Sequence, residues 1–307
     1  MKIIQHPREL AAASRPACLA LGVFDGIHLG HQSIIGQTLE DARKREGTSV
    51  VVTFDRHPEM VLAPTRAPSL IYPPSKKMRV LSELGVAATL VLPFDREFSR
   101  QSGEAFIQGL TRELGGIASV SVGDHFVFGY QRSGDVRLLQ RLGAENQFVV
   151  HGLPPVQWAG QPVSSTRIRN AIALGRFADA TQMLGRPYSL CAIVIEGDRI
   201  GRQWGFPTAN LDAAHLALPP SGVYAVRACI RDQCHPAVLN LGLRPTLNRP
   251  QPRLQVEAHL LDFSGDLYGA EMEIVFVARL RDEMRFPTRE ALQAQILKDI
   301  ATARQCL

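Results

Sequence analysis

The chain has 307 residues, of which 45% are hydrophobic and 21% charged, so it can bury the cores of two domains and is too apolar for intrinsic disorder. Its formal net charge of +5 is not gathered into a basic run, which gives no indication of nucleic-acid binding and equally suits a cleft that attracts phosphates. No apolar segment reaches membrane-spanning length and the first residues lack the apolar core of a signal peptide, so we expect a cytoplasmic protein without nucleic-acid or membrane partners.

Residues 1–180 alternate between strand-like and helix-like patterns. Apolar runs typical of buried strands cover residues 17–24, 49–54, 87–94, 117–123 and 147–156, and helical patterns cover 31–46, 75–84, 103–114 and 135–142. Continuous apolar strands separated by helices predict a parallel sheet that is covered on both faces. Ligands of such sheets bind at the carboxyl ends of the strands.

After about residue 185 the strand-like runs follow one another without helices. They cover residues 188–196, 222–230, 235–241, 254–263 and 271–280. This pattern predicts an antiparallel sheet or small barrel. A last helix is expected over 288–303, with Thr288 as its N-cap. Its predicted apolar stripe consists of Leu292, Ile296, Leu297 and Ile300.

Five cysteines are scattered along the chain without a CxxC pair. They are Cys18, Cys191, Cys229, Cys234 and Cys306. An odd, scattered set argues against a disulfide framework and a structural zinc site, and it fits a reducing compartment.

The segment GVFDGIHLGH (22–31) ends the first apolar run and carries His28 and His31 three positions apart. Two histidines are too few for an ordinary zinc site. The glycines of the segment mark a bend before a helix that starts near Gly30, and a helix N-terminus offers N–H groups and positive potential to a phosphate. Imidazoles there can donate hydrogen bonds to phosphoryl oxygens. From the spacing alone, phosphate binding and a purely structural histidine pair both remain open.

Two further segments have the chemistry of phosphate or metal sites. SSTRIRN (164–170) places hydroxyls and arginines at a helix start, where phosphate binding is reasonable and an ordinary N-cap with solvated arginines is the alternative. In GDRIGRQWGFPTAN (197–210), Thr208 and Asn210 occupy alternate positions of an extended chain, so their oxygens point the same way and suit Mg²⁺ held against nucleotide phosphates. Taken alone, this segment is equally a glycine-rich turn. The chain has neither a P-loop nor a GxGxxG fingerprint.

These motifs carry a resemblance to known families. HxGH after a first strand, with SSTRIRN late in the same domain, resembles the nucleotidyltransferase superfamily, and GRxxGFPTAN resembles riboflavin kinases. The segments GVYAV (222–226), NLGLRPT (240–246), VEAHLLDF (256–263), DLYG (266–269) and LRDEMRF (280–286) follow in the order of the kinase family. The whole chain is similar to the prokaryotic bifunctional riboflavin kinase/FMN adenylyltransferases. The resemblance implies a Rossmann-like α/β nucleotidyltransferase domain over 1–184. It implies a mainly antiparallel β-barrel riboflavin kinase domain with a C-terminal helix over 185–307.

For the first domain, the resemblance implies adenylylation of FMN by ATP with release of pyrophosphate, and catalytic roles for His28, His31 and Arg169. The implied ATP or phosphate contacts are Gly22, Phe24, Gly30, Ser165, Thr166 and Arg167. The FMN phosphate attacks the α-phosphorus directly, so catalysis has to come from positioning and charge stabilisation.

The implied flavin contacts of the first domain are two further histidines. His57 lies in FDRHP (54–58), and a solvated side chain is the alternative there. His125 in GDHFVFG (123–129) stands where the family usually has an acid or amide, which puts this contact in doubt.

For the second domain, the resemblance implies phosphorylation of the ribityl 5′-hydroxyl of riboflavin. Glu257 matches the catalytic carboxylate, and a solvent-facing glutamate on a half-buried strand is the alternative. ATP binding is implied for Gly201, Thr208 and Asn210, the last two with Mg²⁺. Arg281 and Phe286 match positions near the flavin, although Phe286 could simply pack.

The implied cofactor is Mg²⁺, with ATP, riboflavin, FMN and FAD as substrates and products and a weak homo-oligomer allowed. Two other readings stay open. In the first, only one activity survives, namely the kinase, if His125 damages the adenylyltransferase. In the second, the chain is a nucleotide-binding or RNA-binding regulator, which degraded phosphate motifs or basic runs with interleaved aromatics would indicate.

Overall fold

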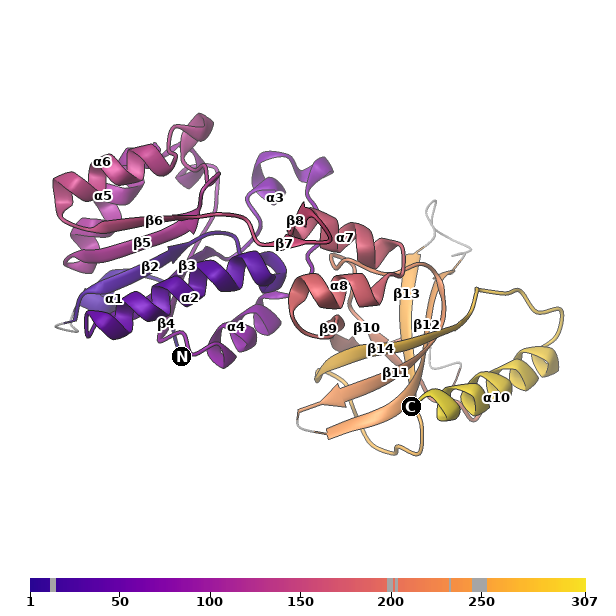
Figure 1. The fold of residues 1–307 in the computed structure, drawn as a ribbon. Helices are drawn as coiled ribbons and strands as arrows, with labels where there is room; N and C mark the ends of the chain where they lie inside the picture. Colours follow the sequence, from indigo (N-terminus) through magenta and orange to yellow (C-terminus); the bar gives the residue numbers. More distant parts are fainter. Residues whose placement is uncertain (12–14, 198–200, 202–203, 232, 245–252) are drawn as a thin grey trace. The chain divides into compact units, whose positions relative to one another are not determined.

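The computed structural model describes residues 1–11, 15–197, 201, 204–231, 233–244 and 253–307 (Figure 1). The chain forms two compact units, which we call the first unit and the second unit. The first unit comprises residues 1–69, 74–167 and 183–185, and the second comprises 70–73, 168–182 and 186–307. Because each unit draws on separate stretches of sequence, the units interleave along the chain.

The first unit is built on a six-stranded parallel sheet with the order β1-β4-β3-β2-β5-β6. Its strands are β1 (Lys2–Ile4), β2 (Ala17–Leu21), β3 (Thr48–Phe54), β4 (Ala88–Leu92), β5 (Ile117–Gly123) and β6 (Val149–Leu153). The predicted parallel sheet is confirmed. The short β1 was not predicted, because three residues carry too little pattern to be recognised.

Helices cover both faces of this sheet, with α2 and α4 on one side and α5 and α6 on the other (Figure 1). The helices are α1 (Arg8–Ala11), α2 (Leu29–Lys44), α3 (Glu59–Leu62), α4 (Pro74–Glu83), α5 (Gly103–Leu114) and α6 (Val136–Asn146). A small hairpin follows, formed by β7 (Gln157–Trp158) and β8 (Gln161–Pro162). All five residues of β2 are buried, as expected of a central strand between two helical layers.

The strand order reverses at β2, which gives the sheet a topological switch point. From β2 the chain adds β3 and β4 on one side, and then β5 and β6 on the other. In open parallel sheets, ligands bind outside the carboxyl ends of the strands at such a point. The HxGH segment follows the end of β2, and the segment containing His125 follows the end of the neighbouring β5.

The second unit is a closed antiparallel barrel with the order β10-β13-β12-β11-β14-β9, which confirms the predicted second fold. Its strands are β9 (Ser189–Ile195), β10 (Ala209–Leu211), β11 (Gly222–Ile230), β12 (Gln233–Arg244), β13 (Arg253–Leu260) and β14 (Glu271–Arg281). In the described part of the chain, three helices follow those of the first sheet: α7 (Ser165–Ala173), α8 (Phe177–Leu184) and α10 (Arg289–Cys306). The three-residue β10 was not predicted, although it closes the barrel between β9 and β13.

The C-terminal helix α10 packs on the barrel. It begins as predicted, because the Thr288 Oγ1 accepts a hydrogen bond from the Ala291 N–H at 3.2 Å. Ala303 is buried in a cluster with strands β11 and β12, and Ile300 packs against that cluster. Leu297, which the predicted stripe included, is 58% exposed. The inner face of the helix instead repeats every four residues through Leu292, Ile296 and Ile300, and Leu297 lies a helical step of about 100° away from it.

Segments from outside the barrel strands complete the second unit. The ring of Phe177 on α8 stacks on Phe276 with centroids 4.8 Å apart and on Tyr188 at 6.0 Å. Residues 70–73 join the same unit, since the Leu70 N–H donates to the His215 carbonyl at 2.8 Å and the Ala217 N–H donates back to the Leu70 carbonyl at 2.7 Å.

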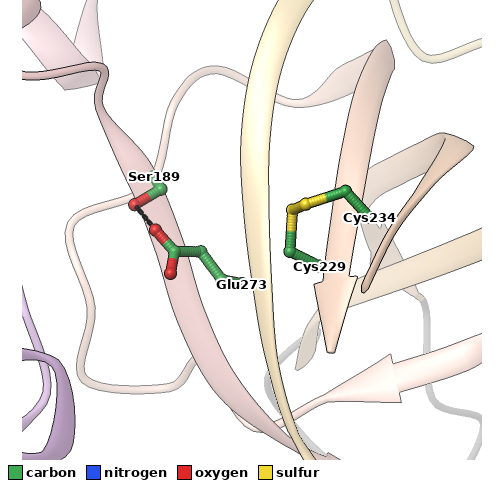
Figure 2. Close-up of a disulfide and its surroundings, with 4 residues drawn as sticks. All are labelled: Ser189, Cys229, Cys234 and Glu273. Carbon is green, nitrogen blue, oxygen red and sulfur yellow. Dashed lines mark hydrogen bonds between the residues drawn. A yellow bond between two sulfur atoms is a disulfide. The ribbon is translucent and has the colours of Figure 1, made fainter. Parts of the chain in front are cut away.

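One pair of cysteines is joined, contrary to the expectation from the scattered set. Cys229 and Cys234 form a disulfide between β11 and β12 (Figure 2). The two positions face each other directly in the hairpin, with Cα atoms 3.9 Å apart, so scatter along the sequence was a poor guide to proximity in space. Cys18 and Cys191 are buried thiols and Cys306 is exposed.

None of the helices in the described part of the chain combines the length and hydropathy that a membrane span requires.

Candidate active sites

In the first unit, His28 is both a motif residue and the N-cap of α2. Its backbone is extended, and its ring Nδ1 accepts a hydrogen bond from the His31 N–H at 3.4 Å. The side chain is buried, at 6% exposure, and its ring stacks on that of His31 with centroids 3.6 Å apart. The two imidazoles therefore sit together at the positive end of a 16-residue helix, the place that favours a phosphate.

The turn that leads to His28 is strained. Phe24 and Ile27 have positive φ angles of 54° and 40°, a region that is sparsely populated by residues with a side chain and unusual for a β-branched one. Each such residue costs about 1–3 kcal/mol and persists only where its surroundings fix it. Both side chains are almost fully buried, and the edge of Phe24 meets His31 with ring centroids 5.2 Å apart. The core thus holds this turn in one conformation.

The late SSTRIRN motif meets the HxGH turn within the first unit. The Ser165 Oγ donates a hydrogen bond to the carbonyl of Asp25 at 3.0 Å. Gly30 of the HxGH motif lies close to the residue that precedes the late motif, because a Cβ on it would stand 3.2 Å from the His28 ring and 4.0 Å from the Val163 carbonyl. Two segments far apart in sequence thus form one surface.

The other residues of the late motif behave differently. The guanidinium of Arg167 donates to the carbonyls of Gln161 and Pro162 at 2.8 and 2.6 Å, so it holds the β7–β8 hairpin in this structure. Thr166 is exposed, and Arg169 is half-buried on the part of α7 that belongs to the second unit.

The two predicted flavin-side histidines of the first unit both follow strand ends. His57 comes after β3, and its Nδ1 accepts a hydrogen bond from the Glu59 N–H at 3.2 Å at the start of α3. His125 comes after β5, and its side chain is 89% exposed beside Asp124. Their carboxyl-end position fits a ligand edge, and no contact of His125 marks it as a binding group.

In the second unit, three polar side chains form a row across the barrel wall. Glu257 on β13 pairs in register with Asn210 on β10 and with Asn240 on β12, so the three side chains share one face. All three line a cavity of about 420 Å³, which we call the barrel cavity. The predicted residues Gly201, Thr208, Arg281 and Phe286 line it as well. Arg202 of the predicted GRxxGFPTAN motif lies outside the described residues.

A second cavity, of about 600 Å³, shares the lining residue Thr208 with the barrel cavity. Its lining includes Pro207, which precedes β10, and Ala209 on that strand, together with Phe263, Asp266 and Tyr268 from the loop after β13. Thr208 lines both cavities, and Asn210 two residues further lines the barrel cavity. The amide of Asn210 lies so close to Gly197 that any Cβ there would overlap it, which explains the glycine.

Two residues of the candidate sites were not found from the sequence. Asp299 on α10 is buried, and its carboxylate accepts two hydrogen bonds from the Arg281 Nε at 3.0 and 3.1 Å and one from its Nη2 at 2.8 Å. Lys77 on α4 donates to groups next to the HxGH turn. Each looks like a surface residue in the sequence, and only the packing of distant elements reveals its role.

Two family models match the chain. The FAD synthetase model matches residues 10–167, and the riboflavin kinase model matches residues 184–307. A solved structure described as a macrolide-efflux protein from Streptococcus pneumoniae superposes with a TM-score of 0.81 at 29% identity, covering 98% of both chains.

Curated relatives match over the full length. The bifunctional riboflavin kinase/FMN adenylyltransferase of Escherichia coli K12 is 37% identical and that of Pseudomonas fluorescens 36% identical, each alignment covering 99% of this chain and 97% of the relative. That of Haemophilus influenzae is 34% identical over 99% of this chain and 98% of its own length. With an HxGH site on a parallel sheet followed by a polar row in a closed barrel, the chain belongs to the bifunctional riboflavin kinase/FMN adenylyltransferase family.

Proposed function

We propose that the second unit makes FMN at the junction of its two cavities, with riboflavin in the barrel cavity and ATP in the second cavity. One observation carries this assignment: Thr208 lines both cavities, and the paired residues Asn210 and Glu257 line the barrel cavity. In this arrangement the Glu257 carboxylate accepts the proton of the ribityl 5′-hydroxyl. The hydroxyl oxygen then bonds to the γ-phosphorus while the bond to ADP breaks.

Magnesium fits the residues at this junction. The Thr208 hydroxyl and the Asn210 amide oxygen are hard ligands, and the in-register Glu257 adds a carboxylate beside them. A bound Mg²⁺ would neutralise charge on the phosphates of ATP. Such an ion takes few protein ligands when phosphates supply the rest.

The first unit is proposed to use FMN as the nucleophile. A phosphate oxygen of FMN bonds to the α-phosphorus of ATP, and the bond to pyrophosphate breaks. The N-terminus of α2, with His28 and His31, would stabilise the charge on the transferring phosphoryl group, and Ser165 would fix the turn through Asp25. Arg169 is proposed as a phosphate ligand, which its guanidinium can bind through two hydrogen bonds.

The remaining parts of the proposal concern setting and boundaries. The small-molecule substrates riboflavin, FMN and ATP account for both sites, and we propose a cytoplasmic enzyme that needs neither nucleic acid nor membrane. Weak self-association is compatible with this scheme. The division of the two activities at residues 184 and 185 stays a prediction, because the two units interleave on either side of it.

Two variants test the residue assignments in one assay, in which riboflavin, ATP and Mg²⁺ are incubated with the full chain and FMN and FAD are separated by chromatography. His28→Ala should accumulate FMN and make little FAD. Glu257→Gln should make FMN about 10²–10⁴-fold more slowly, as expected for loss of a general base, yet convert supplied FMN to FAD normally. The controls are His6→Ala and Glu290→Gln, which change exposed side chains. Undiminished FAD output from His28→Ala would refute the assignment of the first site.

A further inference from the structure

Lys77 joins three backbone and side-chain oxygens beside the HxGH turn. From α4, its Nζ donates to the Thr53 Oγ1 at 3.1 Å, to the Phe54 carbonyl at 3.3 Å and to the Val23 carbonyl at 3.4 Å. The Thr53 Oγ1 itself donates to the same Val23 carbonyl at 3.0 Å. One ammonium therefore ties the end of β3 to the segment that leaves β2.

The position of Val23 makes this tie relevant to the histidines. Val23 directly precedes Phe24, the first left-handed residue of the strained turn that ends at the buried His28. A carbonyl held by two donors fixes the peptide plane from which that turn departs. The turn that leads to the helix N-terminus capped by His28 is thus held at two points, by Lys77 at its start and by Ser165 in its middle.

The charge of Lys77 faces two carboxylates. Asp25, in the turn itself, and Asp55, directly after β3, both favour the ammonium form, and Asp55 is paired with Arg56 at 2.8 Å. Burial acts in the opposite direction and dominates, lowering the pKa of Lys77 to about 8. Lys77 is therefore mostly protonated at neutral pH and loses its charge within a range that the enzyme can be assayed in.

We propose that Lys77 is a positioning residue for adenylyl transfer, which holds the turn between β2 and α2 so that His28 and the helix N-terminus meet the phosphates. The inference rests on the proposed assignment of this reaction to the first unit. A misplacement of about 1 Å in such a site can cost about 10²-fold in rate.

Three variants test it, with the kinase reaction of the same chain as an internal measure of folding. Lys77→Met should lower kcat for FAD formation from FMN by about 10- to 100-fold, with smaller changes in the KM for ATP, and leave riboflavin phosphorylation within twofold. Lys77→Arg keeps the charge and should recover part of the rate. Lys44→Met, which removes an exposed lysine from α2, is the matched control and should match wild type.

The pH profile separates a positioning cation from a packing role. In the wild type, FAD formation should fall as pH rises through about 8, and Lys77→Arg should lack this decline because its guanidinium stays protonated. Riboflavin phosphorylation in the same samples should not show the same dependence on residue 77. An identical alkaline decline in wild type and Lys77→Arg overturns the proposal.

A double-mutant cycle with Thr53→Val covers the case in which Lys77→Met is poorly folded. If both side chains act through the Val23 carbonyl, the double variant should be little worse than Lys77→Met alone. Fully additive losses, or loss of both activities in Lys77→Met, overturn the proposal. FAD formation that survives in Lys77→Met but not in His28→Ala refutes only the role of Lys77, whereas FAD formation that survives in His28→Ala refutes the site assignment itself.

Discussion

Arg281, which lines the barrel cavity, is hydrogen-bonded to Asp299. The Asp299 carboxylate accepts hydrogen bonds from the Nε and Nη2 of Arg281, and the Gln295 Nε2 donates to the same carboxylate at 2.9 Å. The side chains of Arg281 and Asp299 are 18% and 6% exposed, so the pair is largely withdrawn from water. The guanidinium also lies over the ring of Phe286, with Cζ 5.7 Å from the ring centroid. Asp299 thereby sets the direction of Arg281 and, through it, the position of Phe286.

We expect Asp299→Ala to damage riboflavin binding more than catalysis. Removing one partner of a buried pair leaves an uncompensated charge and typically costs about 3–5 kcal/mol, part of which would appear as lower stability of the second unit. The KM for riboflavin should rise about 10- to 100-fold, and Asp299→Asn, which keeps one hydrogen-bonding oxygen, should be milder. Steady-state kinetics of the kinase reaction measure this.

The matched control is Asp262→Asn. Asp262 also pairs with an arginine, Arg304 at 2.8 Å, but its side chain is 73% exposed, and exposed pairs contribute little. A riboflavin KM that is unchanged in Asp299→Ala would mean that Arg281 does not need its partner to shape the cavity.

At the scale of elements, α2 is joined to the sheet by a hydrogen bond between Asp41 and His151, far along the helix from His28. The Asp41 Oδ2 lies 2.9 Å from the His151 Nε2 on β6, and the Gln37 Nε2 donates to the other carboxylate oxygen at 3.1 Å. Burial alone would raise the pKa of Asp41, but the Ser119 hydroxyl, followed by the His151 imidazole and the Gln37 amide, outweighs burial, so the pKa of Asp41 is lowered.

The lowered pKa makes the first unit sensitive to acid. A carboxyl group whose pKa is lower in the folded than in the unfolded chain adds stability above its unfolded pKa of about 4, and this contribution is lost as pH falls below that value. Urea unfolding between pH 3 and 7 should show a steeper acid loss in wild type than in Asp41→Asn. Glu40→Gln, which removes an exposed carboxylate paired with Lys44, should change the slope less, because exposed pairs contribute little. Equal slopes in wild type and Asp41→Asn would rule out this pair as the acid-sensitive contact.

Features set by residues close together in sequence could be predicted, and features set by contacts between distant segments could not. Long apolar runs such as 49–54 and 117–123 predicted strands that the structure contains, because periodicity is a local property. Glu257 and Asn210 were found through motifs. The sequence did not reveal the roles of Lys77 and Asp299, because each depends on contacts with an element distant in sequence. It did not reveal the Cys229–Cys234 pairing either, because that depends on the register of a hairpin.

At the scale of the whole molecule, the barrel depends on a helix that precedes the predicted boundary. Phe177 on α8 packs on both Tyr188, just before β9, and Phe276 on β14, with interplanar angles of 10° and 20°. The rings of Tyr188 and Phe276 also contact each other, with centroids 5.7 Å apart. These ring contacts explain why residues 168–182 belong to the second unit rather than the first.

Phe177→Ala in the full chain should therefore weaken the kinase unit. Loss of a half-buried ring costs about 2 kcal/mol, which should lower the unfolding temperature of the second unit by several degrees in calorimetry. Riboflavin phosphorylation should lose thermal stability, while FAD formation from supplied FMN keeps its own. Leu174→Ala, which trims a side chain that is 62% exposed in the same segment, serves as the comparison. A loss of thermal stability confined to the adenylyltransferase reaction would instead mean that α8 supports the first unit.

The pairing of Leu70 with the strand-like segment around Leu216 also limits how a gene of this kind can be broken or recombined. A single break at the codon for residue 184 would leave residues 70–73 on one polypeptide and their hydrogen-bonding partners, His215 and Ala217, on the other. If recombination exchanged residues 185–307 for another sequence, residues 70–73 of the other half would have to fit the new partner. Otherwise the backbone groups that pair with Leu70 would be left without hydrogen bonds. Inheritance of the two activities as one reading frame is the arrangement that avoids this choice.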